Sequence, residues 1–168
     1  MGKHVLLVSY SQTGQLARLA ASFADGLRAQ GVNVEEAHIR PEPDFAFPWR
    51  FGEFFNTFPE TVHLQPRPIA PLALQRQRYD VVVIAYTVWF LSPSQPVCAF
   101  LQSAQAHALL RDTPVITLIG CRNMWLMAQE KVKKLLAQAG AKLVGNVVKT
   151  DRNSTAASFI TTPVWMLT

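Results

Sequence analysis

Residues 4–31 read HVLLVSYSQTGQLARLAASFADGLRAQG, and this stretch predicts the architecture of the chain. Residues 4–10 form a compact apolar run rich in β-formers, which is typical of a buried strand. Apolar residues then recur at helical spacing: Leu16, Leu19, Ala20, Phe23 and Leu27. Gly31 follows as a typical helix stop. The stretch therefore predicts a strand that leads directly into an amphipathic helix.

The same alternation continues along the chain. Further strands are predicted at residues 32–39, 81–86, 114–120 and 143–148, and further helices at 95–108 and 125–139. The runs at 81–86 and 114–120 contain almost no polar residue, so both of their faces should be buried. This pattern predicts one α/β domain over residues 1–168: a flavodoxin-like, doubly wound, five-stranded parallel sheet with the order 2-1-3-4-5.

Residues 40–78 interrupt the alternation with an insert after the second strand. The insert is rich in Pro and crowds aromatic side chains together: Phe45, Phe47, Trp49, Phe51, Phe54, Phe55 and Phe58. A structureless loop of this length is unusual in a compact domain. Its aromatic side chains need something to pack against, and three candidates stay open: the domain itself, a bound planar ligand or a partner chain.

Composition and charge exclude several classes of protein. With 49% hydrophobic and 16% charged residues, the chain is neither disordered nor a coiled coil. The formal net charge of +5 arises within residues 111–152, which hold eight basic and three acidic residues. We interpret this excess as a solvated helix face with Lys131 and Lys134 pointing outward, rather than as an anion-binding surface. No aromatic residues interleave with these cations, so nucleic acid is not an expected partner.

Membrane and metal sites are not expected either. The longest apolar run, residues 81–91, is too short to span a membrane, and the N-terminus lacks a signal-peptide cleavage region. We therefore expect a cytoplasmic protein. Cys98 and Cys121 and the four His residues show no metal-ligand spacing. Cys121 precedes a predicted helix whose N-terminus can lower its pKa, although we interpret it as a small residue facing the site.

The candidate site lies where the strand order reverses, between the first and third strands, because doubly wound sheets bind ligands beyond the carboxyl ends of their strands. Three loops should converge there, at residues 11–16, 87–95 and 121–125. In the first, Ser11 and Thr13 offer hydroxyls and Gly14 lets the backbone approach an anion at a helix N-terminus. This suits one terminal phosphate, since the GxGxxG and GxxxxGK[ST] patterns are absent. The alternative is a simple Ser/Thr helix cap.

The other two loops offer groups for a planar ring. Trp89 and Phe90 can stack on such a ring, or else pack in the core. Arg122 can add positive charge beside an anionic ring, and Asn123 is a candidate N-cap. The full set of candidate cofactor-binding residues is Ser11, Gln12, Thr13, Gly14, Gln15, Leu16, Thr87, Trp89, Phe90, Cys121, Arg122, Asn123 and Trp125.

YSQTGQ, residues 10–15, resembles the phosphate loop of flavodoxin-like FMN proteins, [ST]-x-T-G-x-T. Ser11, Thr13 and Gly14 match that pattern, and Leu16 replaces its last hydroxyl residue, which removes one phosphate hydrogen bond worth about 1 kcal/mol. Three longer strings resemble a narrower group of flavodoxin-like proteins, labelled dialkylresorcinol condensing enzymes. They are FPWRFGEFFNTFPETV (47–62), WFLSPSQP (89–96) and GCRNMWLMAQEKVKKLLAQAGAKLVGN (120–146).

This resemblance implies FMN as a noncovalent cofactor and an oxidoreductase that oxidises a cyclohexanedione-type ring to a resorcinol. It implies an apolar small-molecule substrate, a separate ketosynthase that acts earlier, and a homodimer as one arrangement. His63 is our candidate for the base that removes the proton, and Glu53 and Glu60 are alternatives for the same role. Two other functions stay open: an NAD(P)H-dependent quinone or flavin reductase, and a cofactor-free subunit of a synthase assembly. A classical electron carrier is disfavoured, because such carriers usually present an acidic face.

Residues 153–168 carry no charge, and the last covering helix of the sheet should lie there. Pro163 and the apolar run at 165–167 predict that this helix is interrupted or cut short. We therefore expect the natural chain to continue beyond Thr168.

Overall fold

A computed structural model of the chain describes residues 2–45, 48–49 and 51–150. Five parallel strands form the sheet: β1 (His4–Ser9), β2 (Asn33–His38), β3 (Val81–Trp89), β5 (Pro114–Cys121) and β6 (Lys142–Thr150). Their order is β2-β1-β3-β5-β6, and the short β4 (Ser92–Pro93) pairs antiparallel with β3. The predicted order of the five parallel strands is confirmed. The expected last helix and the end of the chain lie outside the described residues.

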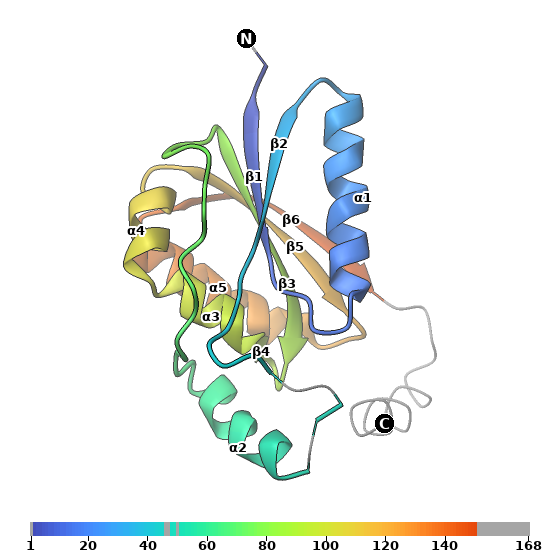
Figure 1. Ribbon diagram of the computed structural model, residues 1–168, viewed down its shortest axis with the longest axis vertical. Coiled ribbons are helices and arrows are strands. Elements are labelled where there is room, and N and C mark those ends of the chain that lie inside the picture. The colour runs from blue at the N-terminus through green and yellow to red at the C-terminus, as the bar shows by residue number, and fades with distance from the viewer. Residues whose placement is uncertain (1, 46–47, 50, 151–168) are drawn as a thin grey trace.

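Helices cover both faces of the sheet (Figure 1). One face packs against α1 (Gln15–Ala29), and the other packs against α3 (Gln95–Leu101), α4 (Ala104–Leu110) and α5 (Trp125–Gln138). Side chains of β1 alternate between the two layers: Val5 and Leu7 face α1, whereas Leu6 and Val8 face the other helices. Because both faces are covered, the central strands read as continuous apolar runs, as predicted.

The end of α1 follows from a backbone conformation that favours glycine. The helix ends at Ala29, and Gly31 follows with a φ of 77°. Its N–H donates to the Arg28 carbonyl at 2.9 Å, which satisfies one of the carbonyls that the last turn leaves free. The predicted helix stop at Gly31 is confirmed.

The single helix predicted over residues 95–108 is wrong, because the chain breaks it into α3 and α4. Ser103 adopts an extended conformation with a ψ of 152°, and its Oγ accepts the N–H of Ala106 at 3.1 Å. Serine favours a cap over a helix interior, since its hydroxyl competes for backbone groups. Ser103 therefore starts a new helix where the apolar spacing alone predicted continuity.

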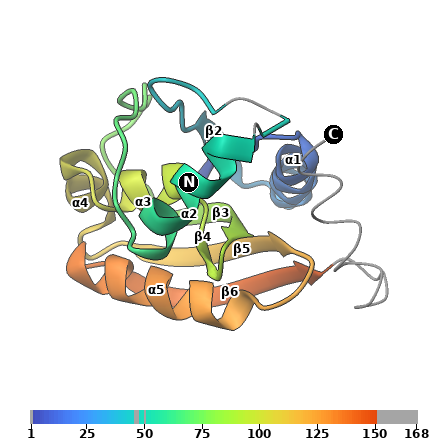
Figure 2. The same cartoon turned by 90° about the horizontal axis from the view of Figure 1, so that it is seen from below.

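The insert is not a structureless loop. It contains α2 (Phe51–Val62), which lies beyond the ends of the strands near β4 (Figures 1 and 2). The chain then returns along the sheet to β3, held by backbone and side-chain bonds. Ala70 N–H donates to the Arg40 carbonyl at 2.8 Å, and the Gln105 amide bonds both the N–H and the carbonyl of Leu72 at 2.9 and 2.8 Å.

None of the helices in the described part of the chain is both long enough and apolar enough to cross a membrane.

Candidate functional site

The strand order reverses between β1 and β3, so the segments that follow β1, β3 and β5 reach the same edge of the sheet. Figure 2 looks toward this edge and shows α2 and β4 across it. We call it the carboxyl edge. The insert therefore contributes to the edge at which the three predicted loops meet.

The first loop places a left-handed glycine at the start of a helix. Gly14 occupies the N-cap of α1 with a φ of 81°, and its N–H donates to Ser11 Oγ at 3.1 Å. No side chain of the described residues caps α1, and its first turn contains no acidic residue. The N–H groups of Gln15 and Leu16 therefore start the helix in a field that favours an anion. The alternative prediction, a Ser or Thr N-cap, is wrong because glycine holds that position.

The side chain of Leu16 belongs to the core. It is 3% exposed, and a Cβ added at Gly120 would lie 3.1 Å from its Cδ1. Leu16 thus packs closely on the backbone of β5. Only its backbone N–H remains suited to contact an anion, and a packing contact takes the place of the hydroxyl of the phosphate-loop pattern.

The second segment, residues 87–95, is a hairpin rather than an open loop. β3 extends to Trp89, and Val88 and Trp89 pair with Pro93 and Ser92. Phe90 and Leu91 form the turn with φ values of 50° and 58°. Positive φ at both central residues is the pattern of a two-residue hairpin turn whose twist matches the strands. The turn holds Phe90 at the carboxyl edge.

Trp89 packs within a group of rings that we call the aromatic cluster: Tyr10, Phe45, Trp49 and Trp89. Trp89 is 7% exposed and meets Trp49, Phe45 and Tyr10 edge to face, with centroids 5.1, 5.4 and 6.0 Å apart. Trp49 is 5% exposed and stacks on Phe45 at 6.1 Å. For Phe45 and Trp49 the structure thus selects packing on the domain itself. Burial, with a smaller contribution from the Asp44 charge, raises the pKa of Tyr10 above its usual value.

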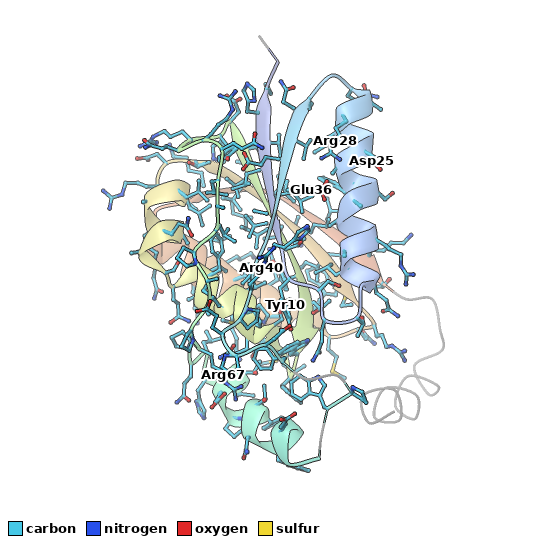
Figure 3. All side chains as sticks on the ribbon, in the orientation of Figure 1. Tyr10, Asp25, Arg28, Glu36, Arg40 and Arg67 are labelled. Atoms are coloured by element: carbon cyan, nitrogen blue, oxygen red, sulfur yellow. The ribbon has the colours of Figure 1, made fainter. Side chains whose placement is uncertain are left out.

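The aromatic cluster is bonded to the first loop. The indole Nε1–H of Trp49 donates to Gln12 Oε1 at 2.9 Å. Arg67 places its guanidinium carbon 5.0 Å from the centroid of the Phe45 ring and forms an ion pair with Glu60 of α2 at 2.6 Å. Tyr10 and Arg67 both lie toward the carboxyl edge of the sheet, in the lower half of Figure 3. Sequence reasoning found the aromatic residues but had no signal for the bond to Gln12.

The third loop differs from prediction at the start of α5. Met124, with a φ of 57°, holds the N-cap of α5, and Asn123 Oδ1 accepts the N–H of Met124 at 2.9 Å. The predicted N-cap at Asn123 is therefore wrong. Burial raises the pKa of Cys121, as suits the interpretation of this residue as a small side chain rather than a reactive thiol. Trp125 is half-buried against the core, and Arg122 is half-buried.

Lys131 does not point outward as predicted. Its Nζ donates to the Val62 carbonyl at 3.1 Å and to Ser92 Oγ at 2.7 Å, which joins α5 to the end of α2 and to the hairpin. Two amides of α3 and its C-cap bond the following carbonyls: Gln95 Nε2 to Gln65 O at 3.0 Å and Gln102 Nε2 to Leu64 O at 2.8 Å. These side chains satisfy a carbonyl that the last turn of α2 leaves free and two carbonyls of the segment that follows it. Lys134 is exposed, as predicted.

The candidate bases lie on or just after α2. Glu53 and His63 are exposed, Glu60 is held by Arg67, and no described residue forms a hydrogen bond with the His63 imidazole. The described residues contain no group of three or more His, Cys, Asp or Glu that could hold a metal. Two cavities of about 620 and 270 Å³ flank β2, and neither is lined by a residue of the three loops.

Comparison with solved structures identifies the fold. A flavoprotein from Lactobacillus acidophilus NCFM, solved in complex with FMN, matches with a TM-score of 0.70 and 15% identity over 88% of this chain and 93% of its own. A candidate flavoprotein from Bacteroides uniformis ATCC 8492 matches with a TM-score of 0.66 and 15% identity over 96% and 99% of the two chains. A flavodoxin from Streptococcus pneumonia TIGR4 matches with a TM-score of 0.54 and 14% identity over 97% and 94%.

No protein-family model and no curated protein sequence matches the chain. The fold is therefore established by structure: an α/β sheet of the flavodoxin-like type.

Proposed function

We propose that the chain binds FMN noncovalently at the carboxyl edge and is an oxidoreductase for an apolar small molecule. One observation carries the proposal: the left-handed Gly14 at the start of an α1 that no described side chain caps. This loop follows a central strand at the point where the strand order reverses, which is where doubly wound sheets bind ligands. The fold resembles that of a flavoprotein solved with FMN, which also supports FMN binding.

The residues of the first loop fit the phosphate end of FMN. Ser11 and Thr13 are half-buried and carry hydroxyls, and the backbone N–H groups of Gln15 and Leu16 add donors at the helix N-terminus. No acidic side chain lies in the first turn of α1 to oppose a phosphate. These groups would bind the phosphate through hydrogen bonds and the helix dipole rather than through a paired cation.

The other two segments fit the ring end. Thr87 and Phe90 border the hairpin, and the backbone of residues 121–123 can bond the polar edge of a ring. The positive charge of Arg122 would stabilise an anionic, reduced ring. When bound, FMN would supply the hydride-accepting chemistry, while the protein supplies binding and orientation.

Exposed apolar side chains support an apolar substrate. Phe55 and Phe58 of α2 are 55% and 46% exposed, Leu91 of the hairpin turn is 38% exposed, and Met124 before α5 is 53% exposed. Phe58 lies against Phe90, with ring centroids 4.7 Å apart, so this surface adjoins the proposed ring site. Exposed apolar surface beside a ligand site favours the binding of an apolar ligand.

Within this class we propose the aromatisation of a cyclic diketone to a dialkylresorcinol. This finer proposal rests on the resemblance of residues 47–62, 89–96 and 120–146. The reaction removes a hydride and a proton from neighbouring positions of the substrate ring, and His63 is the proposed proton acceptor. A ketosynthase that supplies the substrate and a homodimeric state are part of the same proposal.

The first test is a visible absorbance spectrum of the protein purified with excess FMN and then freed of unbound flavin. We expect a yellow protein with the absorbance of bound FMN. A colourless protein with no affinity for FMN would contradict the proposal and favour the cofactor-free subunit. The double variant Thr13→Val, Gly14→Ala supplies the matched control, since it should lose FMN.

A second experiment separates the oxidoreductase from a quinone or flavin reductase. Bound FMN is mixed without oxygen with a cyclic diketone or with NADPH, and bleaching is followed by stopped flow. Bleaching by the diketone with formation of a resorcinol supports the proposed reaction. Rapid bleaching by NADPH alone favours the reductase instead.

A further inference from the structure

Among the described residues, a hydrogen bond from Trp49 Nε1–H to Gln12 Oε1 at 2.9 Å joins the insert to the proposed phosphate loop. We propose that Trp49 is a positioning residue: through Gln12 it holds the phosphate loop in its binding conformation, so the insert sets the affinity for the phosphate end of the cofactor. This inference rests on the proposed function, because it assumes that a phosphate binds at residues 11–16.

The position of Gln12 makes the bond effective. Gln12 stands between Ser11 and Thr13, whose hydroxyls are proposed to contact the phosphate. Ser11 Oγ and Gly14 N–H form a bond within the loop at 3.1 Å, whereas Trp49 anchors the loop from outside. A loop ordered before its ligand arrives loses less conformational entropy on binding, so its affinity is higher. Loss of the Trp49 Nε1–H would remove one of the bonds that order the loop before the ligand binds.

Trp49 is a rigid donor. Its side chain is 5% exposed, stacked on Phe45 at 6.1 Å and edge-on to Trp89 at 5.1 Å. Phe45 in turn lies under the guanidinium of Arg67, which is paired with Glu60 of α2. A continuous set of contacts therefore joins α2 to Gln12. Because these contacts fix the Trp49 side chain, its N–H restrains the position of Gln12. An exposed side chain would move together with the loop and would not restrain it.

The coupling must be reciprocal. If the Trp49–Gln12 bond strengthens phosphate binding, phosphate binding strengthens the bond by the same factor. FMN and riboflavin share the flavin ring and differ in the phosphate. The bond should therefore matter for FMN and not for riboflavin, which separates an effect on the loop from an effect on ring packing.

The test compares dissociation constants for FMN and riboflavin, measured by quenching of flavin fluorescence. Trp49→Phe removes the N–H and keeps a ring, and Gln12→Met removes the acceptor and keeps the length of the side chain. We expect each variant to weaken FMN binding about five- to tenfold and riboflavin binding less than twofold. The double variant should be no worse than either single one. Trp89→Phe is the matched control, which should change both affinities by a similar factor.

The outcomes separate the inference from the proposed function. If the native protein binds neither flavin, the proposed function fails. If it binds FMN but Trp49→Phe weakens both flavins equally, or the two single effects add in the double variant, the inference is wrong. Gln12→Met tests the same bond from the loop, should Trp49→Phe lower folding as seen by circular dichroism. As a second readout, FMN should protect the insert from chymotrypsin more than riboflavin does, and Gln12→Met should abolish that difference; equal protection by the two flavins in the native protein would overturn the coupling.

Discussion

The proposed phosphate loop at residues 11–16 and the insert at residues 40–78 both contribute to the carboxyl edge, but they are held in place by different kinds of contact. The loop is short and internally bonded, with Ser11 holding the amide of Gly14 three residues away. The insert is held by groups far from it in the sequence, such as Gln12, Gln95 and Lys131. The bonds within the loop therefore join residues that are close in sequence, whereas the contacts that hold the insert join residues that are far apart.

The largest effect is expected when the Trp49 ring, which joins the two regions, is removed. Trp49→Ala should lower the free energy of unfolding by about 3–5 kcal/mol, because a buried aromatic side chain leaves a cavity. Urea denaturation measures the change. Phe55→Ala, at a ring that is 55% exposed, is the control and should change stability by less than about 1 kcal/mol. Equal effects at the two positions would show that the insert does not share the core of the domain.

A substitution at Gly14 tests the contribution of the loop. Gly14→Val places a β-branched residue at a φ of 81°, which costs about 1–2 kcal/mol if the conformation is kept. We expect FMN affinity to fall about 10- to 100-fold as the loop shifts, measured by flavin fluorescence. Gly26→Ala, within α1 and with no atom within 4 Å of the added Cβ, should gain about 0.5–1 kcal/mol of stability. FMN binding by Gly14→Val at the native affinity would contradict the proposed site.

Lys131 tests how the far end of the insert is held. Lys131→Met leaves the Val62 carbonyl without its side-chain donor, so the free energy of unfolding should fall by about 1–2 kcal/mol. Amide hydrogen exchange in α2 should also accelerate. Lys134→Met, at an exposed position of the same helix, should change stability by less than about 0.5 kcal/mol. If the two variants behave alike, the Lys131 bonds contribute nothing to the docking of α2.

The smallest effect concerns the thiol beneath the hairpin. Burial raises the pKa of Cys98 to about 12, whereas an unfolded thiol ionises near pH 8.5. Above about pH 8.5 the unfolded state therefore binds fewer protons than the folded state, and stability falls as pH rises toward 12. This thiol should remove about 1 kcal/mol between pH 8 and 9.5. Cys98→Ala should flatten that decline in urea titrations, and an unchanged slope would show that another group causes it.

Much of the fold could be predicted because its signals are repeated and local. Apolar strands such as residues 81–86 recur between helical patterns, and no other common arrangement buries both faces of such strands. The strand order follows from that class of fold, and the loop at Ser11, Thr13 and Gly14 follows from the order. At the candidate site the prediction found the loops but not the hairpin of residues 87–95, whose turn uses two residues, Phe90 and Leu91, that rarely adopt positive φ.

The predictions that were wrong have different causes. Lys131 was expected to face solvent as part of a charged helix face, yet its partner Val62 lies 69 residues away in the sequence. The break at Ser103 comes from a local capping preference, and α5 begins at a left-handed Met124. The apolar spacing predicts neither of them. The sequence left three burial partners open for the aromatic residues of the insert, and in the structure Phe45 and Trp49 pack on Tyr10 and Trp89.

Taken alone, the amino-acid sequence was enough to predict the alternation of strands and helices, the end of α1 before Gly31 and a glycine in the loop before α1. Each depends on φ preferences or apolar spacing within a few residues. Folding in three dimensions was needed to bury Trp49 and to bring its indole N–H to Gln12 across 37 residues. It was also needed to bond the end of α2 to α5 and the residues after α2 to α3. Those contacts are set by which surfaces meet once the sheet has formed, and side-chain hydrogen bonds of that kind have no periodic signal along the chain.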